Sequence, residues 1–157
     1  MPRLTRLDRS VSGLAALVTG AASGMGRATA FLLADEGARV AVTDAVDPAP
    51  VVEAITKAGG EAIGRVLDVS DGAAIARVVG DVAARFGGID ILVNNAGIAR
   101  PTPLDGPGWD EAWAETIAVN LTGEARMVRA CLPYLQASAS GRVVNIASTE
   151  GLGATPR

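Results

Sequence analysis

The sequence contains no histidine, and its 157 residues include a single cysteine, Cys131. Without histidine, these residues cannot form a Ser-His-Asp or Cys-His catalytic group, or a metal site with histidine ligands. One cysteine cannot form an internal disulfide, which is typical of a protein in a reducing compartment. Cys131 lies in an apolar stretch, so we interpret it as a small buried residue, the alternative being a nucleophilic thiol.

Positive charge and long apolar runs are also scarce. The net charge is −3, and Lys57 is the only lysine beside 13 arginines. Such a chain has no electrostatic footprint for nucleic acid or for an anionic membrane. No run approaches the roughly 18 apolar residues of a membrane span, and residues 2–9 lack the apolar core of a signal peptide. We therefore expect a cytoplasmic protein with a flexible tail over residues 1–12 and with no metal, nucleic-acid or membrane partner.

The composition is that of a globular protein, with 49% hydrophobic and 20% charged residues, and the length suits one domain. Short apolar segments alternate with helical patterns along the chain. The predicted strands are 14–18, 39–43, 61–67, 89–93 and 141–146. The predicted helices are 25–36, 50–58, one capped by Ser70, and a long one over 109–135 with a kink near Pro133. This alternation predicts an α/β fold, a doubly wound parallel Rossmann-like sheet with strand order 3-2-1-4-5.

A glycine-rich loop follows the first predicted strand. Glycine is required where the backbone takes a positive φ and where a ligand approaches the main chain closely. The helix that begins there directs its unpaired N–H groups and its positive dipole end at the loop, a suitable site for a diphosphate. The glycines alone could serve only a turn, but their place between the first strand and the first helix favours dinucleotide binding. The predicted cofactor-binding residues of this loop are Gly20, Ser23, Gly24, Met25 and Gly26.

Asp44 ends the second predicted strand, 18 residues after Gly26. A carboxylate at this position can accept hydrogen bonds from both ribose hydroxyls of an adenosine and would repel a 2′-phosphate. Ser23 stands where a basic residue would otherwise meet that phosphate. We therefore predict NAD as the cofactor in preference to NADP, although an aspartate that merely forms a turn is the alternative.

Further motifs follow the later strands: Asp68-Val69, Asn94-Asn95-Ala96-Gly97, Asn120 and Asn145-Ile146-Ala147-Ser148. With the glycine loop, they make the chain resemble the short-chain dehydrogenase/reductase superfamily from about Gly13 to Pro156. The resemblance implies an NAD-binding domain over residues 13–157. It also implies an oxidoreductase that transfers a hydride between nicotinamide and a small alcohol or carbonyl substrate. A nucleotide-fold methyltransferase would also explain Asp44, but it would leave the later motifs unexplained.

The resemblance also assigns roles to these residues. Asp68 and Val69 would contact the adenine, Asn94 would connect neighbouring strands, and Ala96 and Gly97 would line the cofactor ribose. Two residues would be catalytic: Ser148 by binding the substrate oxygen, and Asn120 by perturbing the long helix and holding a water of a proton relay. Ordinary turn, strand-end or solvent-facing residues are the alternatives.

The acid of this family is a Tyr-x-x-x-Lys pair, expected about a dozen residues after Ser148. The only tyrosine here, Tyr134, is followed four positions later by Ser138, and Lys57 belongs to the second helix. We therefore predict a chain that lacks the pair and the last strands of the complete family fold and is inactive alone. The alternative is a truncated dinucleotide-binding module or a partner-dependent subunit. Complete members of the family are usually homo-oligomers.

Overall fold

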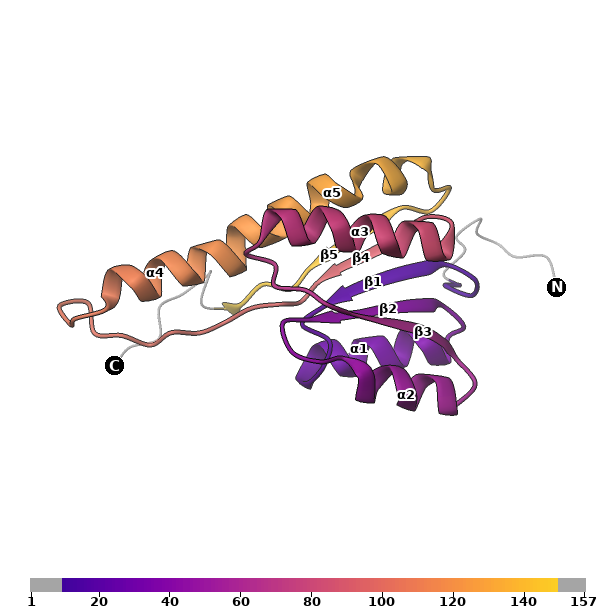
Figure 1. Ribbon diagram of the computed structural model, residues 1–157, viewed down its shortest axis with the longest axis horizontal. Helices are drawn as coiled ribbons and strands as arrows, with labels where there is room; N and C mark the ends of the chain where they lie inside the picture. The colour runs from indigo at the N-terminus through magenta and orange to yellow at the C-terminus, as the bar shows by residue number, and fades with distance from the viewer. Residues whose placement is uncertain (1–9, 150–157) are drawn as a thin grey trace.

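The computed structural model describes residues 10–149 and shows a parallel sheet between two layers of helices (Figure 1). The strands are paired in the order β3-β2-β1-β4-β5, which confirms the predicted order. Every pairing is parallel. The strand bounds are β1 Ala15–Thr19, β2 Arg39–Asp44, β3 Glu61–Val66, β4 Ile91–Asn94 and β5 Arg142–Asn145.

The helices divide between the two faces of the sheet (Figure 1). One face carries α1 and α2, and the other carries α3 and α5, with α4 extending beyond the ends of the strands. Successive side chains of β1 point to opposite faces, so Val18 packs in the cluster under α1 and α2, and Leu17 in the cluster under α3 and α5. The helix bounds are α1 Gly24–Asp35, α2 Ala49–Lys57, α3 Gly72–Phe86, α4 Trp109–Ile117 and α5 Glu124–Ala137.

The start of α3 differs from the prediction. Its N-cap is Asp71, whose Oδ1 accepts hydrogen bonds from the N–H groups of Ala73 at 2.8 Å and Ala74 at 3.1 Å. Ser70 lies one residue earlier, and its own N–H donates to Asp68 Oδ1 at 2.8 Å. Both residue types cap helices well, and the carboxylate is the one placed to reach two N–H groups of the first turn. The predicted apolar face of α3 is buried as expected: Ile75, Val78, Val79, Val82 and Phe86.

The long predicted helix is present but is interrupted. A π-helical segment, η1 (Ala118–Gly123), separates α4 from α5, and Asn120 lies within it. Gly123 allows this segment to approach the loop after β3, because a Cβ there would lie 2.8 Å from the Val69 carbonyl oxygen. The helical course continues through Pro133, which lies inside α5.

The ends of the chain are only partly described. Residues 1–9 of the predicted tail and residues 150–157 lie outside the described residues. Within residues 10–12, Val11 packs against the apolar cluster under α1 and α2, and its carbonyl oxygen accepts a hydrogen bond from the N–H of Leu14 at 3.0 Å. No helix within residues 10–149 has the length and apolarity required to cross a bilayer.

Candidate functional site

A pocket of about 750 Å³ lies at the carboxyl ends of the strands, where open α/β sheets bind their ligands. Its volume is within the range of small-molecule sites. The loops after β1 to β4 form most of the wall, and the start of α1, α4 and η1 form the rest. The pocket brings together these predicted residues: Gly20, Ser23, Gly24, Met25, Asp44, Asp68, Val69, Ala96 and Gly97. The other predicted residues, Gly26, Asn94, Asn120 and Ser148, lie outside its lining.

The glycine loop has a backbone conformation that favours glycine. Gly20 has a φ of 62° and Gly24 a φ of 53°, both in the left-handed region that favours glycine. A Cβ at Gly20 would lie 2.7 Å from Ala96 Cα, and one at Gly26 would collide with the Gly20 carbonyl oxygen. The N-cap of α1, Ser23, makes no capping bond through its side chain, and the first turn carries no acidic residue. The loop and helix end therefore suit a diphosphate.

Asn95 holds this loop in place and was not among the predicted site residues. Its Nδ2 donates to the carbonyl oxygens of Thr19 at 2.9 Å and Gly20 at 3.0 Å. In turn, Thr19 Oγ1 accepts hydrogen bonds from the backbone N–H groups of Asn95 and Ala96, both at 3.0 Å. These bonds join the loop after β1 to the loop after β4. Two consecutive asparagines at a strand end were the available signal, since adjacent side chains there point in opposite directions.

Asn94, the first of these asparagines, points away from the pocket. Its Nδ2 donates to Asn145 Oδ1 at 2.9 Å and to the carbonyl oxygen of Glu124 at 3.5 Å. The side chain therefore connects β4 to β5 and to the start of α5. Its Oδ1 is buried and has no hydrogen-bond partner within residues 10–149.

Asp44 lies at the pocket wall beside the glycine loop. Its Oδ2 accepts a hydrogen bond from the Ala22 N–H at 2.9 Å, and its Oδ1 accepts one from the Val46 N–H at 3.2 Å. These two bonds fix the carboxylate, and each of its oxygens keeps a lone pair for a further hydrogen bond. Asp68, after β3, is a second carboxylate of the same wall.

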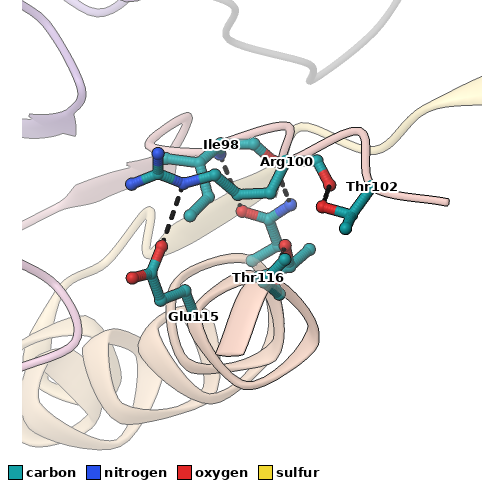
Figure 2. Close-up of polar contacts among 7 residues, drawn as sticks. Ile98, Arg100, Thr102, Glu115 and Thr116 are labelled. Carbon is teal, nitrogen blue, oxygen red and sulfur yellow. Dashed lines mark hydrogen bonds and ion pairs between the residues drawn. The ribbon is translucent and has the colours of Figure 1, made fainter. Parts of the chain in front are cut away.

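Asn120 faces the loop after β4 rather than solvent. Its Oδ1 accepts a hydrogen bond from the Ile98 N–H at 2.9 Å, and its Nδ2 donates to the Ile98 carbonyl oxygen at 2.8 Å. Figure 2 shows both bonds as dashed lines at Ile98. The π-helical segment thus places the Asn120 side chain where it fixes the backbone of Ile98 in the pocket wall.

Arg100 and Glu115 face each other at the pocket, on the loop after β4 and on α4 respectively (Figure 2). The Arg100 Nε lies 2.9 Å from Glu115 Oε2, and both side chains are more than half exposed. The separation of 15 residues along the chain left no periodic signal for this pair in the sequence.

Comparison with known proteins agrees with this geometry. A sequence model described as short chain dehydrogenase matches residues 14–157. The chain belongs to the short-chain dehydrogenase family.

Three relatives illustrate this membership. A cis-4-hydroxycyclohexanecarboxylate dehydrogenase of Sinomonas cyclohexanicum is 43% identical over 87% of this chain and 55% of its own length. A D-threitol dehydrogenase of Mycolicibacterium smegmatis is 40% identical over 90% of this chain and 55% of its own. An uncharacterized NAD-dependent oxidoreductase of Mycobacterium tuberculosis is 35% identical over 94% of this chain and 59% of its own. The chain thus spans little more than half the length of these relatives.

The remaining candidates for chemistry lie outside the lining of the pocket. Ser148 is exposed and follows β5 at the same edge of the sheet. Tyr134 lies in α5 and packs against the core between α3 and the sheet, and Lys57 is the last residue of α2. Burial raises the pKa of the Cys131 thiol to about 12, which leaves it inert as a nucleophile. Within residues 10–149, no cluster of three or more acidic, cysteine or histidine residues could hold a metal ion.

Proposed function

We propose that this chain binds NAD and forms the cofactor-binding part of a dehydrogenase that acts on an alcohol or carbonyl compound. The observation that carries the proposal is the pocket at the carboxyl edge, beside a loop where a Cβ at Gly20 or Gly26 would collide with neighbouring backbone. Bound nicotinamide would supply the hydride chemistry. The chain's own residues would bind the diphosphate at the start of α1 and orient the adenosine between the loops after β2 and β3.

Asp44 supports NAD over NADP. Its fixed carboxylate can accept hydrogen bonds from ribose hydroxyls, whereas a 2′-phosphate would place negative charge beside it. Ser23, in the lining of the same pocket, offers no positive charge in compensation. One relative is named as NAD-dependent, which agrees with this choice.

Calorimetric titration of the purified chain with NADH and NADPH tests the cofactor proposal. We expect NADH to bind at least about tenfold more tightly, because one unfavourable charge contact costs about 1.4 kcal/mol. Asp44→Ser should narrow this difference. Asp35→Ser, which removes a carboxylate at the far end of α1, is the matched control and should preserve it. NADPH binding as tight as NADH binding would remove the role of Asp44, and a chain that binds neither would overturn the proposal.

We further propose that residues 1–157 alone do not catalyse hydride transfer. Ser148 can hydrogen-bond a substrate oxygen, but the Tyr-x-x-x-Lys acid has no counterpart in this sequence. General acid catalysis contributes on the order of 10²–10⁴-fold. We expect no change in NADH absorbance with any carbonyl compound tested. Turnover that persists in Tyr134→Phe would show that another group supplies the proton.

A binding module or partner-dependent subunit is the second candidate, and the exposure of β5 favours it. Val143 is 42% exposed and Val144 is 46% exposed, so this strand has apolar surface for a partner. Mixing the chain with a complete relative and measuring complex formation by light scattering tests this candidate, and a strictly monomeric chain in every mixture argues against it.

The substrate, the assembly and the location are also proposals. The names of two relatives specify hydroxyl-bearing compounds, which supports an alcohol as substrate. We propose a homo-oligomer for the complete protein, which size-exclusion chromatography with light scattering would test. The single buried thiol supports a cytoplasmic location, and recovery in another cell fraction would contradict it.

A further inference from the structure

Arg100 occupies an unusual place among the charged residues of the pocket. The acidic residues in the lining are Asp44, Asp68 and Glu115. Among the described residues, Arg100 is the only basic residue that lines the pocket. A dinucleotide adds two negative phosphate groups to a wall that already carries three carboxylates. The positive end of α1 offsets only about half an elementary charge. A cation near the diphosphate would therefore have a large influence on binding.

The ion pair leaves most of the Arg100 guanidinium available. Only Nε lies at Glu115, with an Nε–Oε2 distance of 2.9 Å. Within residues 10–149, no protein acceptor holds its two terminal amino groups. Figure 2 shows the guanidinium reaching from the loop towards Glu115, with both terminal nitrogens at its far end. The planar guanidinium can donate two parallel hydrogen bonds to phosphate oxygens.

The backbone that carries Arg100 is held on both sides. Asn120 fixes Ile98 through two hydrogen bonds, and Thr102 Oγ1 donates to the Arg100 carbonyl oxygen at 3.2 Å. The side chain therefore extends from a fixed backbone, which lowers the entropy lost when it orders on a ligand. Glu115 holds the guanidinium at the pocket without using the donors that suit a phosphate.

We propose that Arg100 is a further cofactor-binding residue whose terminal amino groups bind the diphosphate of the dinucleotide, with Glu115 holding the guanidinium in place. The inference rests on the proposed function, since it assigns a contact to the same ligand. The pocket then has two diphosphate contacts of different kinds: backbone N–H groups at the start of α1, and a charged side chain on the loop after β4.

A purely structural role makes a different prediction for Glu115. If the pair served only to attach the loop to α4, loss of either partner would loosen the wall and weaken every ligand. If Arg100 binds the diphosphate, Glu115 competes for the same cation. Glu115→Gln keeps an acceptor for Nε but removes the negative charge, so it should strengthen the binding of diphosphate ligands.

The test is a set of titrations at low salt with NADH, ADP and adenosine, followed by calorimetry or by NMR shifts for weak ligands. Arg100→Gln should weaken NADH and ADP about tenfold and leave adenosine unchanged, since a charge-assisted hydrogen bond is worth about 1.5–3 kcal/mol. Glu115→Gln should tighten ADP about twofold to threefold. Arg77→Gln, an exposed arginine of α3 outside the pocket, is the matched control and should change nothing.

The outcomes separate the two proposals. Equal weakening of all three ligands by Arg100→Gln and Glu115→Gln, with unchanged melting temperatures, overturns the role of Arg100 in favour of a structural pair. Unchanged ADP affinity in Arg100→Gln overturns it as well. If the wild-type chain binds none of the three ligands, the proposed function itself fails. If the wild type binds NADH and only Arg100→Gln behaves unexpectedly, the proposed function stands without this contact.

Discussion

One row of the sheet carries four valines whose surroundings differ sharply. Val42 of β2, Val18 of β1, Val93 of β4 and Val144 of β5 are register partners across neighbouring strands. The first two are 0% exposed and Val93 is 4% exposed, whereas Val144 is 46% exposed. The same side chain in the same sheet thus goes from full burial at the centre to half exposure at the β5 edge. This difference in exposure shows that the described residues bury the centre of the sheet and leave the β5 edge partly uncovered.

The functional residues follow the same division. At the centre, Thr19, Asn95 and Asp44 hold the loops of the pocket through hydrogen bonds to neighbouring segments. At the edge, Ser148 follows β5 and is exposed. The proposed cofactor site therefore lies in the buried centre of the fold, and the proposed substrate contact at Ser148 lies at its exposed edge.

Among the substitutions in the buried centre of the fold, we expect Gly26→Ala to have the largest effect on cofactor affinity and stability. In Gly26→Ala, the new Cβ would collide with the Gly20 carbonyl oxygen and with Asn95 Nδ2. We expect NADH affinity to fall at least about 100-fold and the free energy of unfolding to fall by about 2 kcal/mol, since the backbone must move. Calorimetry and urea unfolding measure the two effects.

Gly80→Ala is the matched control for this substitution. A Cβ at Gly80, in the middle of α3, would meet no atom within 4 Å. Binding should be unchanged, and the helix should gain up to about 1 kcal/mol from the better helix former. Wild-type affinity in Gly26→Ala would show that the loop adapts and that the cradle does not require glycine there.

Substitutions of the four register-paired valines should have the next largest effect, on the free energy of unfolding. Val18→Ala should lower the free energy of unfolding by about 2 kcal/mol, since it removes two buried methyl groups and leaves a cavity. Val144→Ala should lower it by less than about 0.5 kcal/mol. Urea unfolding of both variants measures the contrast. Equal losses at the two positions would mean that Val144 is covered in solution and that the comparison between centre and edge is wrong.

Cys131 gives the smallest effect and reports on α5, the helix that packs beside the edge. Burial raises the pKa of its thiol from 9.0 to about 12. Since the folded pKa is the higher one, this group stabilises the fold fully below pH 9, and its contribution is lost as the pH rises from 9 towards 12. Up to pH 9.5 we expect a loss of less than about 1 kcal/mol, which should be absent in Cys131→Val. The same pH dependence in that variant would exclude the thiol as its cause.

Much of the fold could be predicted because its signals are local. Apolar strand segments and the spacing of Ile75, Val78 and Val82 depend on sequence periodicity alone. The N-cap of α3 is Ser70 or Asp71 according to where the first helical turn begins. The sequence does not decide between them, because both residue types cap helices well. The family resemblance implied a perturbed helix at Asn120, but the close approach of Gly123 to Val69 joins distant segments of the chain and left no local signal.

Some features of the candidate site could likewise be predicted from the sequence, and others could not. The glycine loop and Asp44 stand at fixed distances from the strands, so their place at the pocket follows from the order of the elements. The bonds of Asn95 to the glycine loop and the pairing of Arg100 with Glu115 depend on which way individual side chains turn. Those directions are fixed only when four loops meet at one edge of the sheet.

The central position of β1 has a consequence for the assembly of the sheet during synthesis. A ribosome delivers the N-terminal end first, so β1, β2 and β3 can pair when only the first 66 residues are available. The other edge of β1 has no partner until residues 91–94 emerge, and the glycine loop lacks Asn95 until the next residue follows. We expect a nascent chain arrested before that point to expose one unpaired strand edge and to bind no dinucleotide.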